Sequence, residues 1–183
     1  MRIVAISGSL RKASFNRSIL FALAEVAPVG MAIEIQPIAD VPLFNQDVEA
    51  EGTPEAVQRL RDAIAAADGV LVATPEYNAG MPGVLKNAID WLSRPPGRSV
   101  LGGKPTALVG VTPGQLGTAR AQGQLRAAFE FVAAPVMPAP QVFVGQARDK
   151  FDADGRLTDQ KTRTYLKTFM EAFARWVTRN APD

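Results

Sequence analysis

The segment Ile3-Val4-Ala5-Ile6-Ser7-Gly8-Ser9-Leu10-Arg11-Lys12-Ala13-Ser14-Phe15-Asn16 sets the class of fold. Four apolar residues followed at once by small polar residues predict a short buried strand that ends in an exposed loop. A helical spacing of apolar residues begins after the loop, over residues 17–27. A buried strand, a polar loop and an amphipathic helix form the first half of a β-α-β unit, which indicates a parallel sheet.

Four further apolar runs have the length and composition of strands, namely residues 32–36, 70–73, 106–111 and 142–144. Helical patterns are expected at residues 53–67, 82–93, 118–131 and 158–178, the last with Leu166, Phe169, Phe173 and Trp176 on its core face. Residues 37–52 are expected to be irregular. Thr53 is expected to cap the next helix, with Pro54 at its first position.

Five strands that alternate with helices predict an α/β protein, in which right-handed crossovers give a doubly wound three-layer sandwich. Five strands, rather than six, favour the flavodoxin-like order 2-1-3-4-5. No repeat, low-complexity tract or linker interrupts the pattern, so residues 1–183 are expected to form a single domain. In such a sheet ligands bind where the strand order reverses, which here places the loops 7–16 and 74–81 at one site.

The composition excludes several kinds of chemistry. The chain has no Cys and no His, which excludes thiolate and imidazole metal sites, cysteine nucleophiles and Ser-His-Asp triads. The 20 Lys+Arg nearly balance the 18 Asp+Glu and form no basic block, so neither nucleic acid nor a membrane surface is an expected partner. No signal-peptide pattern or membrane-spanning apolar stretch is present, so a cytoplasmic protein is expected.

The first loop has the chemistry of a phosphate site, because it places hydroxyls, an amide and cations just before a helix start. The side chains suited to bind phosphate oxygens are Ser9, Arg11, Ser14, Asn16 and Ser18. The loop matches neither G-x-G-x-x-G nor the P-loop pattern, which disfavours dinucleotide-binding and P-loop proteins. The alternative is a plain polar connection in which Asn16 caps the helix.

Two other loops at the same edge of the sheet suit a planar heterocycle. The second loop, Pro75-Glu76-Tyr77-Asn78, combines a carboxylate, an aromatic ring and an amide, and flexible Ala79-Gly80 follows. The third loop, residues 112–117, contains glycines that let a backbone approach a flat ring closely. The alternatives are a turn in which Tyr77 covers the core and an ordinary flexible connection.

These segments resemble the NADPH-dependent FMN reductase family, especially its quinone and chromate reductase branch. The resemblance is carried by Gly8–Asn16, Pro75–Asn78 and Pro82–Trp91. It implies that the first loop holds the FMN phosphate, the second the isoalloxazine and ribityl, and the third closes on the ring. The implied FMN-binding residues are Ser9, Arg11, Ser14, Phe15, Asn16, Pro75, Glu76, Tyr77, Asn78, Val111, Thr112, Pro113 and Gly114. The chain departs from the family at Gly80, where Ser is frequent.

The resemblance also implies an oxidoreductase in which two half-reactions share one site. NADPH or NADH, bound transiently, passes hydride to N5 of FMN, and an acceptor such as a quinone, an azo compound, chromate or free flavin then takes two electrons. The cofactor performs this chemistry, so no catalytic side chain and no metal are expected. Arg11 is also a candidate to hold the nicotinamide cofactor or an anionic acceptor.

Family members are usually homodimers or homotetramers, which implies a dimer face on the helix at 82–93, with Asn87 and Trp91 toward a partner subunit. Two other functions stay open at this point. One is a flavin-binding electron carrier without turnover, although such carriers are typically strongly acidic. The other is a phosphate- or nucleotide-binding regulatory module that uses the first loop without flavin.

Overall fold

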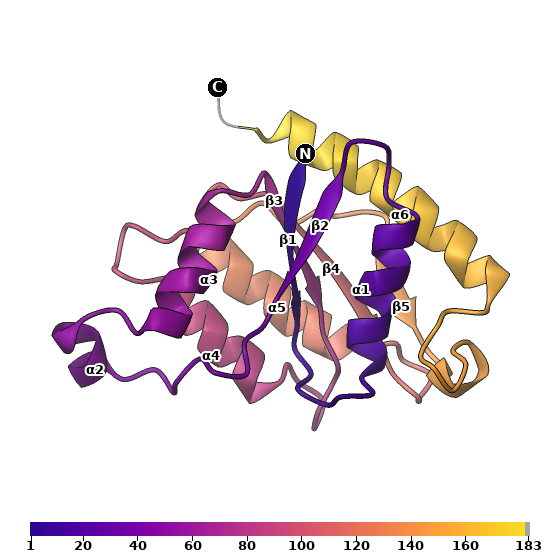
Figure 1. The fold of residues 1–183 in the computed structure, drawn as a ribbon, viewed down its shortest axis with the longest axis horizontal. Helices are drawn as coiled ribbons and strands as arrows, with labels where there is room; N and C mark the ends of the chain where they lie inside the picture. The colour runs from indigo at the N-terminus through magenta and orange to yellow at the C-terminus, as the bar shows by residue number, and fades with distance from the viewer. Residues whose placement is uncertain (182–183) are drawn as a thin grey trace.

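The structure is a computed structural model that describes residues 1–181. Its five parallel strands form one sheet in the order β2-β1-β3-β4-β5, with helices on both faces (Figure 1), which confirms the predicted flavodoxin-like sandwich. The strands are β1 (Arg2–Ser7), β2 (Ala32–Gln36), β3 (Gly69–Ala73), β4 (Thr106–Val111) and β5 (Val142–Val144). The helices are α1 (Phe15–Glu25), α2 (Gln46–Glu51), α3 (Glu55–Ala65), α4 (Gly83–Leu92), α5 (Ala119–Phe131) and α6 (Gln160–Arg179), with a 3-10 turn at η1 (Ala147–Asp149).

The alternation of side chains along the central strands divides the core in two. Ile3 and Ala5 of β1 pack with α1 and α6 on one face of the sheet. Val4 and Ile6 point to the opposite face and pack with α3, α4 and α5. Because both faces of the sheet are covered, the central strands are continuously apolar, as a parallel sheet requires.

The register of the sheet brings the ends of three strands level with one another. Ser7 pairs with Ala73, and Ala73 pairs with Val109. The ladder extends past the strands, since the N–H of Gly8 donates to the carbonyl of Ala73 at 2.8 Å. The loops that follow β1, β3 and β4 therefore leave the sheet at one edge, the lower edge in Figure 1.

Helix α1 begins two residues before the predicted position. The Ser14 hydroxyl oxygen accepts the N–H groups of Asn16 and Arg17 at 3.2 and 3.4 Å, so Ser14 is the N-cap. The alternative that made Asn16 the cap is wrong, because Asn16 lies inside the first turn of the helix.

The expectation for residues 37–52 is also wrong in part. They include the short helix α2, whose N-cap Asn45 accepts the N–H of Asp47 at 2.9 Å. Helix α3 starts only at Glu55, because Pro54 has extended backbone and occupies the cap position without a side-chain bond. Thr53 therefore lies outside the helix and does not cap it.

The core face of α6 is mostly as predicted. Leu166, Phe169 and Phe173 are buried, whereas Trp176 is half-buried and donates its Nε1–H to the Pro135 carbonyl at 3.0 Å. Among residues 1–181, no helix combines the length and the apolarity needed to cross a bilayer.

The end of β4 and the start of α5 approach each other so closely that only glycine fits at position 110. A Cβ there would lie 1.7 Å from Thr118 Oγ1 and 2.7 Å from the carbonyl oxygen of Thr74. This contact fixes where α5 begins relative to the sheet edge.

Gly110→Ala is expected to lower the free energy of unfolding by about 1–3 kcal/mol, because the added methyl group overpacks this contact. The matched control is Gly123→Ala within α5, where a Cβ meets no atom within 4 Å. That substitution is expected to raise stability by about 0.5–1 kcal/mol through helix propensity. Urea denaturation followed by circular dichroism measures the free energy of unfolding of both variants. A Gly110→Ala variant that is as stable as the parent or more stable would contradict the close approach.

Candidate active site

The first loop offers unpaired backbone donors. Within the described part of the chain, the N–H groups of residues 10–13 and of Phe15 make no hydrogen bond, although they lie directly before and at the start of α1. Ser9 and Ser14 are buried in the same loop, while Arg11 is exposed. Successive free N–H groups at a helix start bind anions such as phosphate. The loop therefore has the donor set that a phosphate monoester requires.

Asn16 joins the first loop to the third. Its Nδ2 donates to the Val111 carbonyl and its Oδ1 accepts the Val111 N–H, both at 2.9 Å. Asn16 is only 3% exposed, so its amide serves this contact within the fold. Sequence reasoning missed the contact because the two residues are 95 positions apart.

Phe15 lies beside the same junction. Its ring stacks at a tilt against Phe151, with 5.5 Å between the ring centroids, and it packs against the core cluster shared by α1 and α6. The side chain thus anchors the start of α1. Any contact of Phe15 with a cofactor stays a prediction.

The second loop contains a tight turn. The N–H of Tyr77 donates to the Gly80 carbonyl and the N–H of Gly80 to the Tyr77 carbonyl, both at 3.0 Å. The two central residues, Asn78 and Ala79, have φ of 50° and 61°, which defines a type I′ turn. The segment is therefore a closed hairpin turn. The Tyr77 ring is 49% exposed, so the alternative in which it covers the core is also wrong.

Helix α5 bonds to both ends of this hairpin turn. The Glu76 carboxylate accepts the N–H groups of Arg120 and Ala121 at 2.9 and 3.2 Å, and its negative charge lies at the start of the helix, where it is favourable. Gln124 Oε1 accepts the N–H of Met81 at 3.0 Å. The Glu76 side chain is therefore committed to positioning the turn.

The same helix explains the glycine at position 80. A Cβ on Gly80 would lie 2.8 Å from Gln124 Oε1, so a serine here requires the Gln124 side chain to move. Gly80 leaves room for the bond that Gln124 makes to the hairpin.

The third loop is held by backbone hydrogen bonds to the segment after β5. The N–H of Thr112 donates to the Val144 carbonyl at 3.0 Å, and the Thr112 carbonyl accepts the N–H of Ala147 at 3.1 Å. The Gly114 carbonyl accepts the N–H of Gln146 at 2.8 Å. Gly114 itself stays open, since a Cβ there would meet only Thr112 Oγ1, at 3.8 Å.

The structure thus brings all three predicted loops to one edge of the sheet. Ser9, Arg11 and Ser14 belong to the loop with free donors, Tyr77 and Asn78 to a rigid turn, and the third loop presents the backbone of Thr112, Pro113 and Gly114. Asn16, Glu76 and Val111 join the loops to one another and to α5. These residues fit FMN, whose phosphate needs an anion site and whose planar ring needs a rigid, open backbone.

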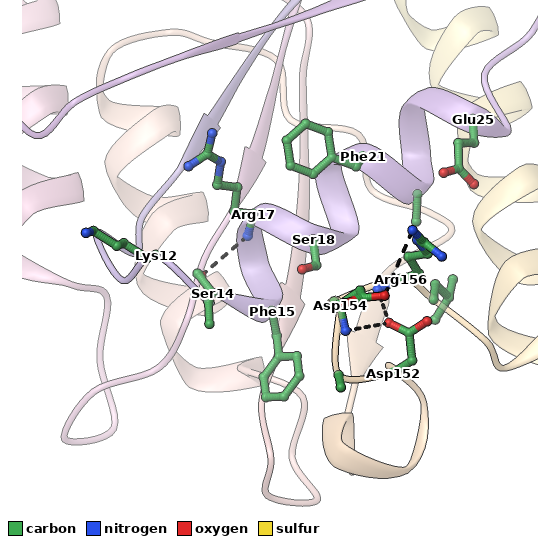
Figure 2. Close-up of a pocket in the computed structure, with 15 residues that line it drawn as sticks. Lys12, Ser14, Phe15, Arg17, Ser18, Phe21, Glu25, Asp152, Asp154 and Arg156 are labelled. Carbon is green, nitrogen blue, oxygen red and sulfur yellow. Dashed lines mark hydrogen bonds and ion pairs between the residues drawn. The ribbon is translucent and has the colours of Figure 1, made fainter.

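The first loop also borders two hollows that sequence reasoning did not locate. One, of about 560 Å³, lies between α1 and the segment 152–157 and is drawn in Figure 2. It mixes the cations Lys12, Arg17 and Arg156 with the carboxylates of Glu25, Asp152 and Asp154. The second lies between the first loop and the end of β2.

A doubly wound sheet of this order, with an anion-binding loop after β1 at the point where the strand order reverses, defines a flavodoxin-like nucleotide-binding protein. The NADPH-dependent FMN reductase family matches residues 1–149, and the chain belongs to this family.

Similar proteins agree with this assignment. The chain is 47% identical to a quinone reductase of Pseudomonas putida, over 97% of this chain and 95% of that protein. It is 43% identical to a 2-hydroxy-1,4-benzoquinone reductase of a Burkholderia species, over 97% and 96%. Among solved structures, FerB, a flavoenzyme NAD(P)H:(acceptor) oxidoreductase from Paracoccus denitrificans, superimposes with a TM-score of 0.91 at 38% identity and covers 99% of both chains.

These relationships confirm the predicted family and the prediction that the protein is an FMN- and NAD(P)H-dependent oxidoreductase. They disfavour a regulatory module that works without flavin. The individual FMN contacts stay predictions.

Asn16→Ala is expected to lower the free energy of unfolding by about 2–3 kcal/mol, because the buried N–H and carbonyl of Val111 lose their partners. Asn45→Ala is the control, since Asn45 is an exposed helix cap whose loss costs about 1 kcal/mol. Urea denaturation of both variants gives the comparison. Equal losses would show that the bonds between Asn16 and Val111 contribute nothing beyond an ordinary cap.

Proposed function

We propose that the protein is an FMN-dependent NAD(P)H:quinone oxidoreductase. The observation that carries the proposal is the run of unpaired N–H groups over residues 10–13, which lies at the same sheet edge as the turn at Tyr77. The overall reaction balances as NAD(P)H, a proton and a quinone giving NAD(P)⁺ and a hydroquinone. The names of the similar proteins support a quinone acceptor.

When bound, FMN supplies the redox chemistry, accepting a hydride from NAD(P)H and passing two electrons to the acceptor. The chain's own residues bind and orient it. Ser9, Ser14 and the loop N–H groups would hold its phosphate, and Arg11 would balance the phosphate charge. The turn that carries Tyr77 and Asn78 would hold the ring and ribityl.

The remaining predicted contacts fall into two kinds. Pro75, Thr112, Pro113 and Gly114 would offer backbone and apolar surface to the ring. Asn16, Glu76 and Val111 act as positioning residues, because their polar groups already bond to other parts of the fold. Phe15 anchors the helix start against Phe151.

We further propose that azo compounds, chromate and free flavin are alternative acceptors, since all accept electrons from a shallow, exposed flavin face. We also propose that residues 1–183 form one FMN-binding domain. The cytoplasmic location stays a prediction.

The FMN titration of purified apoprotein tests the function. Near-stoichiometric binding is expected, with bleaching of the flavin absorbance on addition of NADPH and its recovery on addition of a quinone. Binding without bleaching would favour an electron carrier, and the absence of binding would contradict the flavin assignment.

The variant Arg11→Ala with Ser14→Ala is expected to weaken FMN binding by about tenfold or more, because it removes a cation and a hydroxyl from the phosphate site. Lys167→Gln, an exposed cation on α6, is the control and is expected to bind FMN as the parent does. An unchanged FMN affinity in the double variant would refute the phosphate assignment of the first loop.

We also propose a homodimer or homotetramer. Trp91 is buried by the chain itself and donates to the Pro42 carbonyl at 2.8 Å, and Asn87 bonds to Pro42 and Phe44. These two residues therefore hold the segment after β2 in place, while a subunit contact through α4 stays a prediction. The segment presents Leu43, which is 83% exposed, as the apolar contact we favour.

Leu43→Glu is expected to reduce the oligomer to a smaller species, because a charge cannot be buried at an apolar contact without a partner. Light scattering coupled to size exclusion at micromolar concentration measures the mass. Phe131→Glu, which changes another highly exposed apolar residue, at the end of α5, serves as the comparison. A monomeric mass for the parent protein would remove the oligomer proposal.

A further inference from the structure

The amide of Gln124 lies beside Gly80, the residue that closes the Tyr77 turn. The three atoms nearest to a Cβ built on Gly80 are Oε1, Nε2 and Cδ of Gln124, at 2.8, 3.1 and 3.4 Å. Gln124 is in the second turn of α5, and its side chain is exposed. The end of this side chain therefore fills the space that the glycine leaves and stays open to solvent.

One hydrogen bond fixes which way round the amide lies. The N–H of Met81 donates to Gln124 Oε1 at 3.0 Å, and only the oxygen of an amide accepts an N–H. Within residues 1–181, Gln124 Nε2 donates to no acceptor. The side chain thus holds the hairpin with its oxygen and keeps the two N–H donors of Nε2 free.

The other polar side chains around this turn are engaged. The Glu76 carboxylate accepts the N–H groups of Arg120 and Ala121. Gln122, one residue pair before Gln124 on α5, is buried and donates to the Val142 carbonyl at 2.9 Å. The Nε2 group of Gln124 is therefore a side-chain donor at the turn that the fold itself does not use.

The turn offers this donor together with an aromatic surface. Tyr77 pairs with Gly80 across the turn, and its ring is 49% exposed. The hairpin follows β3 at the carboxyl edge of the sheet, where the strand order reverses and ligands bind. A flat ring that carries a carbonyl oxygen suits an aromatic surface beside an N–H donor, and a quinone is such a molecule.

We propose that Gln124 Nε2 donates a hydrogen bond to a carbonyl oxygen of the quinone and orients it, with Gly80 leaving the space for the amide. The inference rests on the proposed function and names the residue that recognises its acceptor. The quinone oxygens gain negative charge as the two electrons arrive, so a fixed donor stabilises the transition state more than the free quinone. Gln124 transfers no proton, and the overall reaction remains NAD(P)H, a proton and a quinone giving NAD(P)⁺ and a hydroquinone.

Two substitutions separate the two ends of the amide. Gln124→Glu keeps an oxygen that can accept the N–H of Met81 and removes the free donor. Gln124→Ala removes both groups. Gln160→Ala, at an exposed glutamine at the start of α6, is the matched control.

The first measurement is the binding of duroquinone to FMN-loaded protein without NADPH, by isothermal titration calorimetry. Duroquinone is uncharged and stays oxidised without a reductant, so the titration reports binding alone. Both Gln124 variants are expected to weaken this binding by about threefold to tenfold, the effect of one hydrogen bond. Gln160→Ala is expected to bind duroquinone as the parent does.

Turnover gives a second readout. In both Gln124 variants, kcat/KM for duroquinone is expected to fall by at least the factor seen in binding. The rate at which NADPH bleaches the flavin absorbance is expected to stay within about twofold in Gln124→Glu, because the quinone takes no part in that half-reaction. Ferricyanide has no carbonyl oxygen and takes single electrons, two ions for each NADPH, so its reduction is expected to be affected less than that of duroquinone.

Gly80→Ala tests the space beside the amide. The φ of Gly80 lies outside the left-handed region, so an added methyl group strains no backbone torsion, and its three nearest neighbours all belong to Gln124. This variant is expected to weaken duroquinone binding as Gln124→Ala does. Combined with Gln124→Ala it is expected to cause no further loss, because the group that the methyl displaces is gone.

Four results would overturn the inference. Unchanged duroquinone binding in Gln124→Glu would remove the role of Nε2 while the proposed function stands. An equal loss from Gly80→Ala with and without the Gln124 side chain would show that the methyl group itself obstructs the quinone. A loss of bleaching rate in Gln124→Glu as large as the loss with duroquinone would show general damage to the flavin site. A protein that binds no FMN would overturn the proposed function and, with it, this inference.

Discussion

The pair of hydrogen bonds between Asn16 and Val111 is the contact on which the arrangement of the site depends. It joins the first turn of α1 to the last residue of β4, so that the loop after β1 cannot move independently of the loop after β4. Both groups are buried, and a buried amide without its partners is costly. The fold therefore keeps the first loop and the third loop in one fixed relation.

Helix α5 positions the second loop by similar hydrogen bonds. Glu76 and Gln124 fix the two ends of the Tyr77 turn to the first turns of this helix, and Gly110 lets the helix start close to β4. The site is preorganised by hydrogen bonds between loops and helices rather than by residues that would touch the flavin. Such rigidity suits a protein whose cofactor performs the chemistry, because the chain has only to hold and orient it.

Many elements of the fold could be predicted from periodicity. The strands at 32–36, 106–111 and 142–144 agree with the structure, because continuous apolar runs between turn residues leave little choice of element. The ends of helices were harder to predict where more than one residue could serve as the N-cap. Ser14 caps α1 although Asn16 is an equally good capping residue by type, and the Asn16 amide bonds to Val111 instead.

The sequence by itself determined the parallel sheet, the strand order, the three loops at one edge and the family, since these follow from local patterns and short motifs. It did not determine what each polar side chain in those loops does. Asn16, Glu76 and Trp91 bond to groups 44 to 95 positions away. The hollow beside the first loop likewise combines residues of that loop with the end of β2. Only the tertiary structure decides such contacts, because a hydrogen bond depends on distances that the folded chain alone defines.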